Sequence, residues 1–194
     1  YFCKRVNDQY NYFEINKKTY DKLNSRTDDY DYNLHIADTS NLALIKTKKR
    51  LKKYFPKKKI KSIHIKPQDK KLNIKDNSYD YIIAMSVLSL LGSKKNILKL
   101  LNEFKRVLKP NGKIIIDIND HNSEFSKGMK MISKNVFEVD QIGSNKFNAY
   151  CLKTKRDFEK LICDFFKIID SGYSCHMIFK RRINEWIICG KNNK

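Results

Sequence analysis

Single polar side chains follow the apolar segments of this sequence at places where they could bind a ligand or accept a proton. A carboxylate accepts charge-assisted hydrogen bonds, and a histidine exchanges a proton near neutral pH. If the apolar segments are parallel strands, their carboxyl ends meet at the edge where open α/β sheets bind ligands. The candidates at these ends are Asp38, Thr39, Gln68, Asp69, Met85, Ser86 and His121.

His121 is the candidate for proton transfer. It follows the apolar segment 113–118, so a sheet would place it at the mouth of the crevice. There it could take a proton from an oxygen or nitrogen nucleophile. The alternative is a structural or solvated loop histidine. His121 is the one catalytic residue that we predict.

Alternating strand-like and helix-like segments must position these side chains. Ser93 is a good helix cap, and Pro56 would end a helix. The pattern predicts an α/β sandwich over 1–194, a single domain with a mostly parallel sheet and an antiparallel C-terminal hairpin. We expect an N-terminal lid helix within 1–31, and an insertion or substrate lid at 119–150 with a short helix near 125–132. Strands are predicted at 32–37, 60–65, 79–85, 113–118, 167–178 and 183–189, and helices at 41–54, 94–108 and 154–164.

Two stretches together have a specific resemblance. Residues 72–88 form an acidic, serine-containing turn that leads into an apolar strand, and residues 103–114 end a helix with Arg106-Val107-Leu108-Lys109-Pro110-Asn111-Gly112. The pair resembles the class I S-adenosylmethionine-dependent methyltransferases, in the style of their small-molecule, ubiquinone-biosynthesis-like branch. The resemblance covers residues 32–118 well. It implies a Rossmann-like fold, S-adenosylmethionine as cofactor and methyl transfer as the activity.

The resemblance also implies roles for the candidate residues. Asp38 matches the acid that accepts hydrogen bonds from both ribose hydroxyls, because it lies 76 − 38 = 38 residues before Asp76. Gln68 or Asp69 would bind the adenine amino group, and Met85 and Ser86 would line the methionine end of the cofactor. The alternatives are that Asp38 caps the next helix, that the Gln68–Asp69 pair lies in a solvated loop, and that Met85 belongs to the core.

The family's glycine-rich cofactor loop is not visible in this sequence. Residues 1–91 contain no glycine, and the loop is expected about 20 residues before the acid, near Lys18. One explanation is that the first strand and its loop are missing from the sequence, with 24–31 as the seam. A second is a relative that has lost cofactor binding and serves as a scaffold or interaction module. The third is a different cofactor loop.

The chain is a basic protein with a formal charge of +20, and 34 of its 41 basic residues are lysine. Residues 46–71 hold thirteen Lys or Arg and a single acid, Asp69, which suits RNA or an anionic surface. The alternative is a solvated basic face in a lysine-rich composition. We expect a small-molecule methyl acceptor first, and RNA or protein second.

Composition argues against three classes of protein: disulfide-stabilised, zinc-binding and membrane-spanning. The five cysteines include no C-x-x-C pair, which argues against a disulfide framework and a zinc site. No apolar run approaches about 18 residues, so no membrane span is predicted. We expect an intracellular, cytoplasmic protein with no metal.

Overall fold

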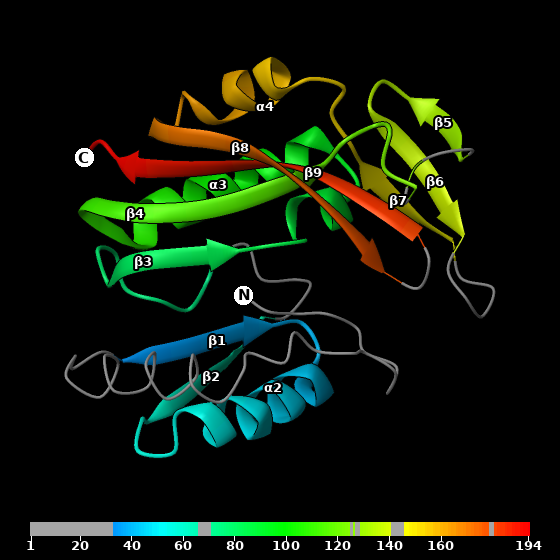
Figure 1. Ribbon diagram of the computed structural model, residues 1–194. Coiled ribbons are helices and arrows are strands. Elements are labelled where there is room, and N and C mark those ends of the chain that lie inside the picture. Colours follow the sequence, from blue (N-terminus) through cyan, green and yellow to red (C-terminus); the bar gives the residue numbers. More distant parts are fainter. Residues whose placement is uncertain (1–32, 66–70, 125, 127–128, 141–145, 179–180) are drawn as a thin grey trace. The chain divides into compact units, whose positions relative to one another are not determined.

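The computed structural model describes residues 33–65, 71–124, 126, 129–140, 146–178 and 181–194, which Figure 1 shows as coloured ribbons. The chain divides into two compact units at residues 69 and 70, here called the N-terminal and C-terminal units. Each is described by itself. The predicted lid helix, together with Gln68 and Asp69, lies outside the described residues.

The N-terminal unit is a βαβ unit. Strands β1 (Leu34–Asp38) and β2 (Ile60–His64) are parallel and in register from Leu34 opposite Ile60 to Asp38 opposite His64. Helix α2 (Asn41–Tyr54) connects them, and it begins where the Ser40 hydroxyl accepts a hydrogen bond from the Ala43 N–H at 3.3 Å. The predicted strands and helix are confirmed within two residues at each end.

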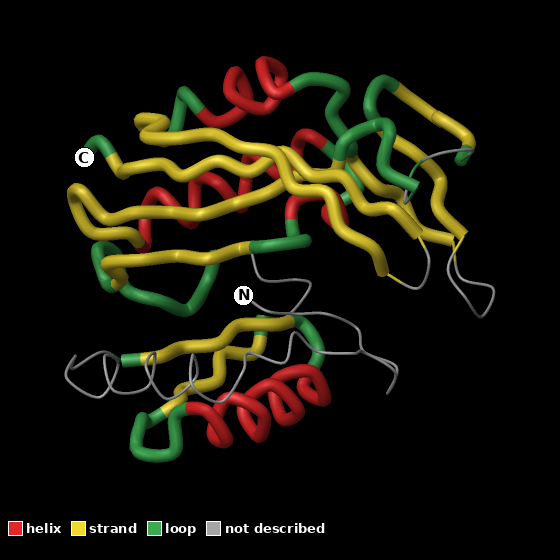
Figure 2. The backbone as a smooth tube through the Cα atoms, in the orientation of Figure 1, coloured by secondary structure: helices red, strands yellow, loops and turns green. Residues whose placement is uncertain are grey.

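The C-terminal unit has a four-stranded sheet in the order β3-β4-β9-β8 (Figure 2). Strands β3 (Tyr79–Ala84) and β4 (Leu108–Asn119) are parallel, and β9 (Arg181–Asn192) pairs antiparallel with β4 and with β8 (Phe166–Ile178). The 3-10 helix η1 (Leu88–Leu91) and helices α3 (Lys94–Val107) and α4 (Lys155–Ile162) complete the unit. The predicted antiparallel hairpin is confirmed.

The two faces of this sheet differ. Ile114, Ile116 and Ile118 of β4 are fully buried in one cluster with side chains of both α3 and α4. Because strand side chains alternate, Ile115 and Asp117 lie on the opposite face. Ile115 is 38% exposed, whereas Asp117 is only 1% exposed. Asp117 is therefore buried away from the apolar core.

Arg106 of helix α3 connects the loop before β3 to this helix through hydrogen bonds. Its guanidinium donates to Asp76 Oδ1 at 2.6 Å and to both carboxylate oxygens of Glu103. It also donates to the carbonyls of Leu72 and Ile74, while Glu103 accepts the Leu72 N–H at 2.7 Å. A planar group with five donors satisfies all these acceptors at once. The two stretches that carry the family resemblance are thus one hydrogen-bonded assembly.

The segment 119–150 contains a small antiparallel sheet of its own. It consists of β5 (Lys130–Ser133), β6 (Val136–Asp140) and β7 (Lys146–Tyr150) in sequential order. The predicted helix near 125–132 is wrong where the structure describes it, because Lys130–Ser133 is a strand. Asn135, at a φ of 65°, supports the tight turn into β6. No described helix is long and apolar enough to cross a bilayer.

Candidate functional site

Asp38 is buried at the carboxyl end of β1, with 5% of its surface exposed. Its Oδ1 accepts a hydrogen bond from the Ser40 N–H at 2.7 Å, whereas the residue that caps α2 is Ser40 itself. Within the described part of the unit, Oδ2 has no hydrogen bond. Thr39 is exposed beside it, and its carbonyl lies 3.0 Å from His64 Nε2. One carboxylate oxygen is thus available for a ligand hydroxyl.

Ser86 follows β3 after Met85 and has a φ of 56°, in the left-handed region. This backbone conformation is uncommon for a residue other than glycine, and such residues cluster at functional sites. The Ser86 N–H donates to Asp117 Oδ1 at 2.6 Å. The structure therefore brings the predicted Met85–Ser86 position against the buried carboxylate of β4.

Glu185 of β9 joins the same place. The Ser86 hydroxyl donates to its Oε1 at 3.3 Å, and its Oε2 lies 3.8 Å from His176 Nδ1 on β8. Glu185 is 4% exposed, whereas the His176 side chain is 35% exposed. We call Ser86, Asp117, His176 and Glu185 the acidic cluster. Its four members come from β8, β9, β4 and the residues after β3.

Burial sets the electrostatics of the acidic cluster. It raises the pKa of Asp117 to about 7, because a buried carboxylate loses its hydration, and the charge of Glu185 acts in the same direction. The Ser86 N–H opposes both effects. Asp117 can therefore gain or lose a proton near neutral pH.

Sequence reasoning missed Asp117 and Glu185. Each is a carboxylate within an apolar strand: Asp117 interrupts the run Ile114–Ile118, and Glu185 lies two residues after Ile183. Buried acids are rare unless they are paired, so each was a detectable signal. That the two meet follows only from the pairing of β4 with β9, in which Asn119 lies opposite Glu185.

The ring of His121 contacts β6 and the residue that follows β7. Its Nε2 lies 2.9 Å from the Cys151 carbonyl, which can only accept, and the ring packs edge-on against Phe137 at 5.0 Å. These contacts leave Nδ1 as the nitrogen for any proton transfer. The catalytic role of His121 stays a prediction, as do the cofactor roles of Asp38, Thr39, Gln68, Asp69, Met85 and Ser86.

Comparison with known proteins gives the class of the fold. A methyltransferase from Methanosarcina mazei, described as S-adenosylmethionine-dependent, superposes with a TM-score of 0.70 at 18% identity, covering 88% of this chain and 85% of that one. A Clostridium acetobutylicum methyltransferase of the same description has a TM-score of 0.59 at 17% identity over 84% and 76%. The N-methyltransferase NodS of Bradyrhizobium japonicum, solved with S-adenosylhomocysteine, has a TM-score of 0.55 at 10% identity over 84% and 67%. These likenesses show a Rossmann-like methyltransferase fold.

The family follows from the sequence. A family described as "Methyltransferase domain" matches residues 19–116, half of the chain, and the chain belongs to that family. The resemblance to S-adenosylmethionine-dependent methyltransferases is therefore confirmed, and with it the expected cofactor and enzyme class. No curated protein sequence matches the chain.

The residues present fit this cofactor. Asp38 offers a carboxylate oxygen that suits a ribose hydroxyl, and Ser86 has the strained backbone common beside bound ligands. Asp38 belongs to the N-terminal unit, and Met85 and Ser86 belong to the C-terminal unit.

Proposed function

We propose that this protein transfers the methyl group of S-adenosylmethionine to a small-molecule acceptor. Family membership supports the reaction, and the observation that carries the site is Ser86, held in the left-handed region by its hydrogen bond to Asp117. Asp38 would hold the ribose, and Met85 and Ser86 would line the methionine end. S-adenosylmethionine, when bound, supplies an activated methyl group on a sulfonium.

The chain's own residues position and desolvate the reactants. A transfer of this kind depends on placing the nucleophile in line with the methyl carbon in a site that excludes water. Buried carboxylates beside Ser86 would orient a polar acceptor group. The small-molecule acceptor is favoured because the acidic cluster would repel the phosphates of RNA.

Asp38→Ala tests the cofactor site. We expect calorimetric titration of S-adenosylhomocysteine to show micromolar binding by the wild-type protein, about −8 kcal/mol. The variant should lose about 1.5–3 kcal/mol, since a buried charge-assisted hydrogen bond is removed. Asp164→Ala, at an exposed carboxylate of the other unit, is the matched control and should bind like the wild type.

Two results would contradict the proposal. Unchanged affinity in a folded Asp38→Ala variant removes Asp38 from the cofactor site. Absence of S-adenosylhomocysteine binding by the folded wild-type protein favours the scaffold alternative over the enzyme.

A further inference from the structure

The acidic cluster contains more acceptors than the protein satisfies. Asp117 uses Oδ1 for the Ser86 N–H, and its Oδ2 is fully buried with no hydrogen-bond partner. Buried polar atoms are normally satisfied, and an unsatisfied carboxylate oxygen is unusually costly. An atom of this kind, in a family site, indicates a donor that arrives with a ligand.

The cluster also lacks a strong cation. The chain holds 41 lysines and arginines, yet among the described residues none forms an ion pair with Asp117 or Glu185. The basic group that contacts Glu185 there is His176, whose Nδ1 lies 3.8 Å from Glu185 Oε2. Elsewhere the same chain pairs its acids readily, as Arg106 with Glu103 and Lys146 with Glu138 show. The unmet requirement is therefore a positive charge that carries N–H donors.

Three kinds of ligand group could meet acidic side chains. A metal ion is disfavoured, because no three His, Cys, Asp or Glu side chains of the described residues converge closely enough to hold one. A hydroxyl would satisfy one oxygen but would leave the negative charge uncompensated. An ammonium group supplies both the charge and up to three donors.

We propose that the acidic cluster binds an amine group of the methyl acceptor, and that the methylated atom is this nitrogen. The inference rests on the proposed function and names its substrate class. Glu185 holds the positive charge, and Asp117 Oδ2 accepts one N–H. Ser86 connects the two carboxylates to Met85, where the methionine end of the cofactor is proposed.

The acidic cluster can accept the proton that the ammonium group must lose before methyl transfer. An ammonium bound as R–NH3⁺ gives one proton to Asp117 Oδ2 and becomes R–NH2. The nitrogen lone pair then forms the N–C bond while the S–C bond pair stays on sulfur, which becomes a neutral thioether. The product is the secondary ammonium R–NH2⁺–CH3, still paired with Glu185. The high pKa of Asp117 suits it to receive the proton near neutral pH.

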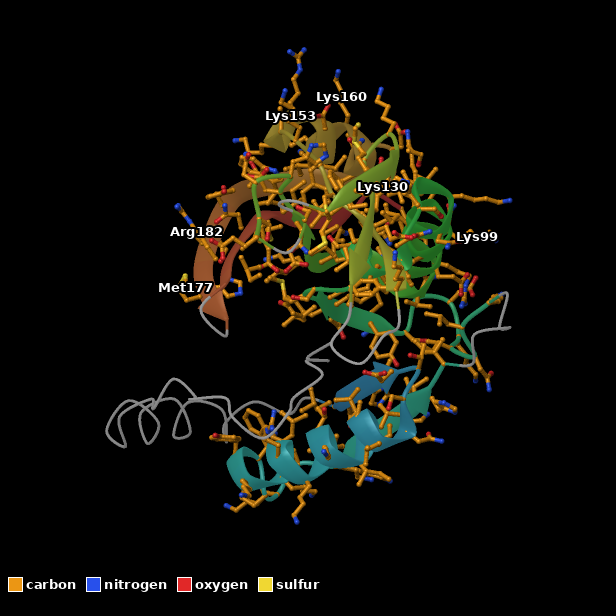
Figure 3. The ribbon with its side chains drawn as sticks, turned by 90° about the vertical axis from the view of Figure 1, so that its right-hand side faces the viewer. Lys99, Lys130, Lys153, Lys160, Met177 and Arg182 are labelled. Atoms are coloured by element: carbon orange, nitrogen blue, oxygen red, sulfur yellow. The ribbon has the colours of Figure 1, made fainter. Side chains whose placement is uncertain are left out.

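The partly exposed member of the acidic cluster lies on the β8–β9 hairpin. His176 is partly exposed, and the next residue, Met177, is 64% exposed. Figure 3 shows Met177 and Arg182 projecting at the outer end of this hairpin. Because strand side chains alternate, His176 and not Met177 shares a face with Glu185, so a ligand would reach Glu185 past His176.

The test compares amines with alcohols of the same shape. Benzylamine with benzyl alcohol and phenethylamine with phenethyl alcohol are titrated into the full chain by ligand-observed NMR, without cofactor. We expect each amine to bind about tenfold or more tightly than its alcohol. Equal binding of amine and alcohol, or no binding of either, would overturn the proposal.

Variants assign the preference to the acidic cluster. Glu185→Gln and Asp117→Asn keep the side-chain shape and remove the charge, and each should abolish the amine preference. Asp170→Asn, at an exposed carboxylate of β8, is the matched control and should keep it. Circular dichroism establishes whether each variant folds. If one of the two cluster variants does not fold, the amine preference of the other tests the proposal. A preference that survives in a folded variant contradicts the proposal.

A parallel titration separates this inference from the proposed function. Amine preference with no S-adenosylhomocysteine binding would keep the amine site and reject the methyltransferase function. S-adenosylhomocysteine binding without amine preference would keep the methyltransferase function and reject the amine site.

Discussion

At the scale of single residues, Arg106 shows how a family motif can be structural. Its contacts with Glu103, Asp76 and two carbonyls hold the loop that leads into β3. The hydrogen bond from Arg106 keeps the pKa of Glu103 below its usual range, which favours the charged pair. The motif therefore anchors the loop that leads into β3.

Arg106→Lys should destabilise the protein although it keeps the charge. Lysine has three donors on a point charge and cannot satisfy four acceptor groups at once. We expect a loss of about 1–3 kcal/mol in the free energy of unfolding, measured with urea. Arg156→Lys, at an exposed position of α4, should change little. Equal stability of the two variants would show that the hydrogen bonds of Arg106 contribute nothing measurable to the free energy of unfolding.

Asp117 makes stability depend on pH. Its pKa is about 7 in the folded protein and about 3.8 in the unfolded chain, so the folded state holds the proton more tightly. The stability that this carboxyl contributes is complete below about pH 4 and is lost as the pH rises through 7. Asp117→Asn removes the dependence.

Urea unfolding of both proteins at about pH 4.5 and about pH 8 measures this effect. From the lower to the higher pH, we expect the free energy of unfolding of the variant to rise relative to that of the wild type by about 3 kcal/mol. Comparing the two proteins cancels the other titrating groups. A stability difference that stays constant with pH would mean that Asp117 is not buried as a carboxylate.

At the scale of elements, most of the fold could be predicted from sequence because its signals are local. Ser93 and Thr154 accept hydrogen bonds from the N–H groups of Asn96 and Asp157, and α3 and α4 begin at the residues that follow them. The failure falls in 119–150, where alternation is weak and β5 is exposed along its whole length. Such a strand is specified by its partner β6 and not by its own pattern.

The candidate site was predicted in part for the same reason. Asp38 ends β1 and Ser86 lies two residues after β3, so local pattern was enough to single them out. Asp117 and Glu185 meet only through the pairing of β4 with β9, which local pattern does not specify. The single domain predicted over 1–194, and the lid roles of 1–31 and 119–150, stay predictions.

Asn192 joins β9 to the end of helix α3. Its fully buried Nδ2 lies 3.0–3.2 Å from the carbonyls of Lys105, Leu108 and Lys109. Asn192→Asp replaces this donor with a buried acceptor that faces carbonyl oxygens. We expect a loss of about 3 kcal/mol or more by urea unfolding. Asn193→Asp, the exposed neighbour, is the control; if both variants unfold at the same urea concentration, the contact to α3 is unimportant.

At the scale of the whole molecule, the positive charge is distributed over more than one surface. In the N-terminal unit, a hollow of about 500 Å³ includes Lys48, Lys59 and Lys61 in its lining. In the C-terminal unit, Figure 3 shows Lys153 and Lys160 projecting beside and from α4. This distribution favours a lysine-rich composition over one dedicated patch.

RNA binding should therefore be weak, dependent on salt and equally sensitive to lysines of either unit. Fluorescence anisotropy with a labelled single-stranded RNA can compare the triple variants Lys46→Gln/Lys48→Gln/Lys49→Gln and Lys153→Gln/Lys155→Gln/Lys160→Gln. Each triple variant removes three charges. The slope of log affinity against log salt concentration should therefore become shallower by about two. A much larger loss in the α2 variant would assign RNA binding to the N-terminal unit.

The pairing of β4 with β9 also sets the order of events during synthesis. Asp117 lies opposite Ile187, which the ribosome adds 187 − 117 = 70 residues later. Until then, a nascent chain holding β3, α3 and β4 lacks Glu185 and leaves one edge of β4 without its partner strand. Pairings this distant in sequence form slowly, and an unpaired strand edge invites aggregation. The acidic cluster is thus assembled late, and chaperone demand should peak before β9 emerges.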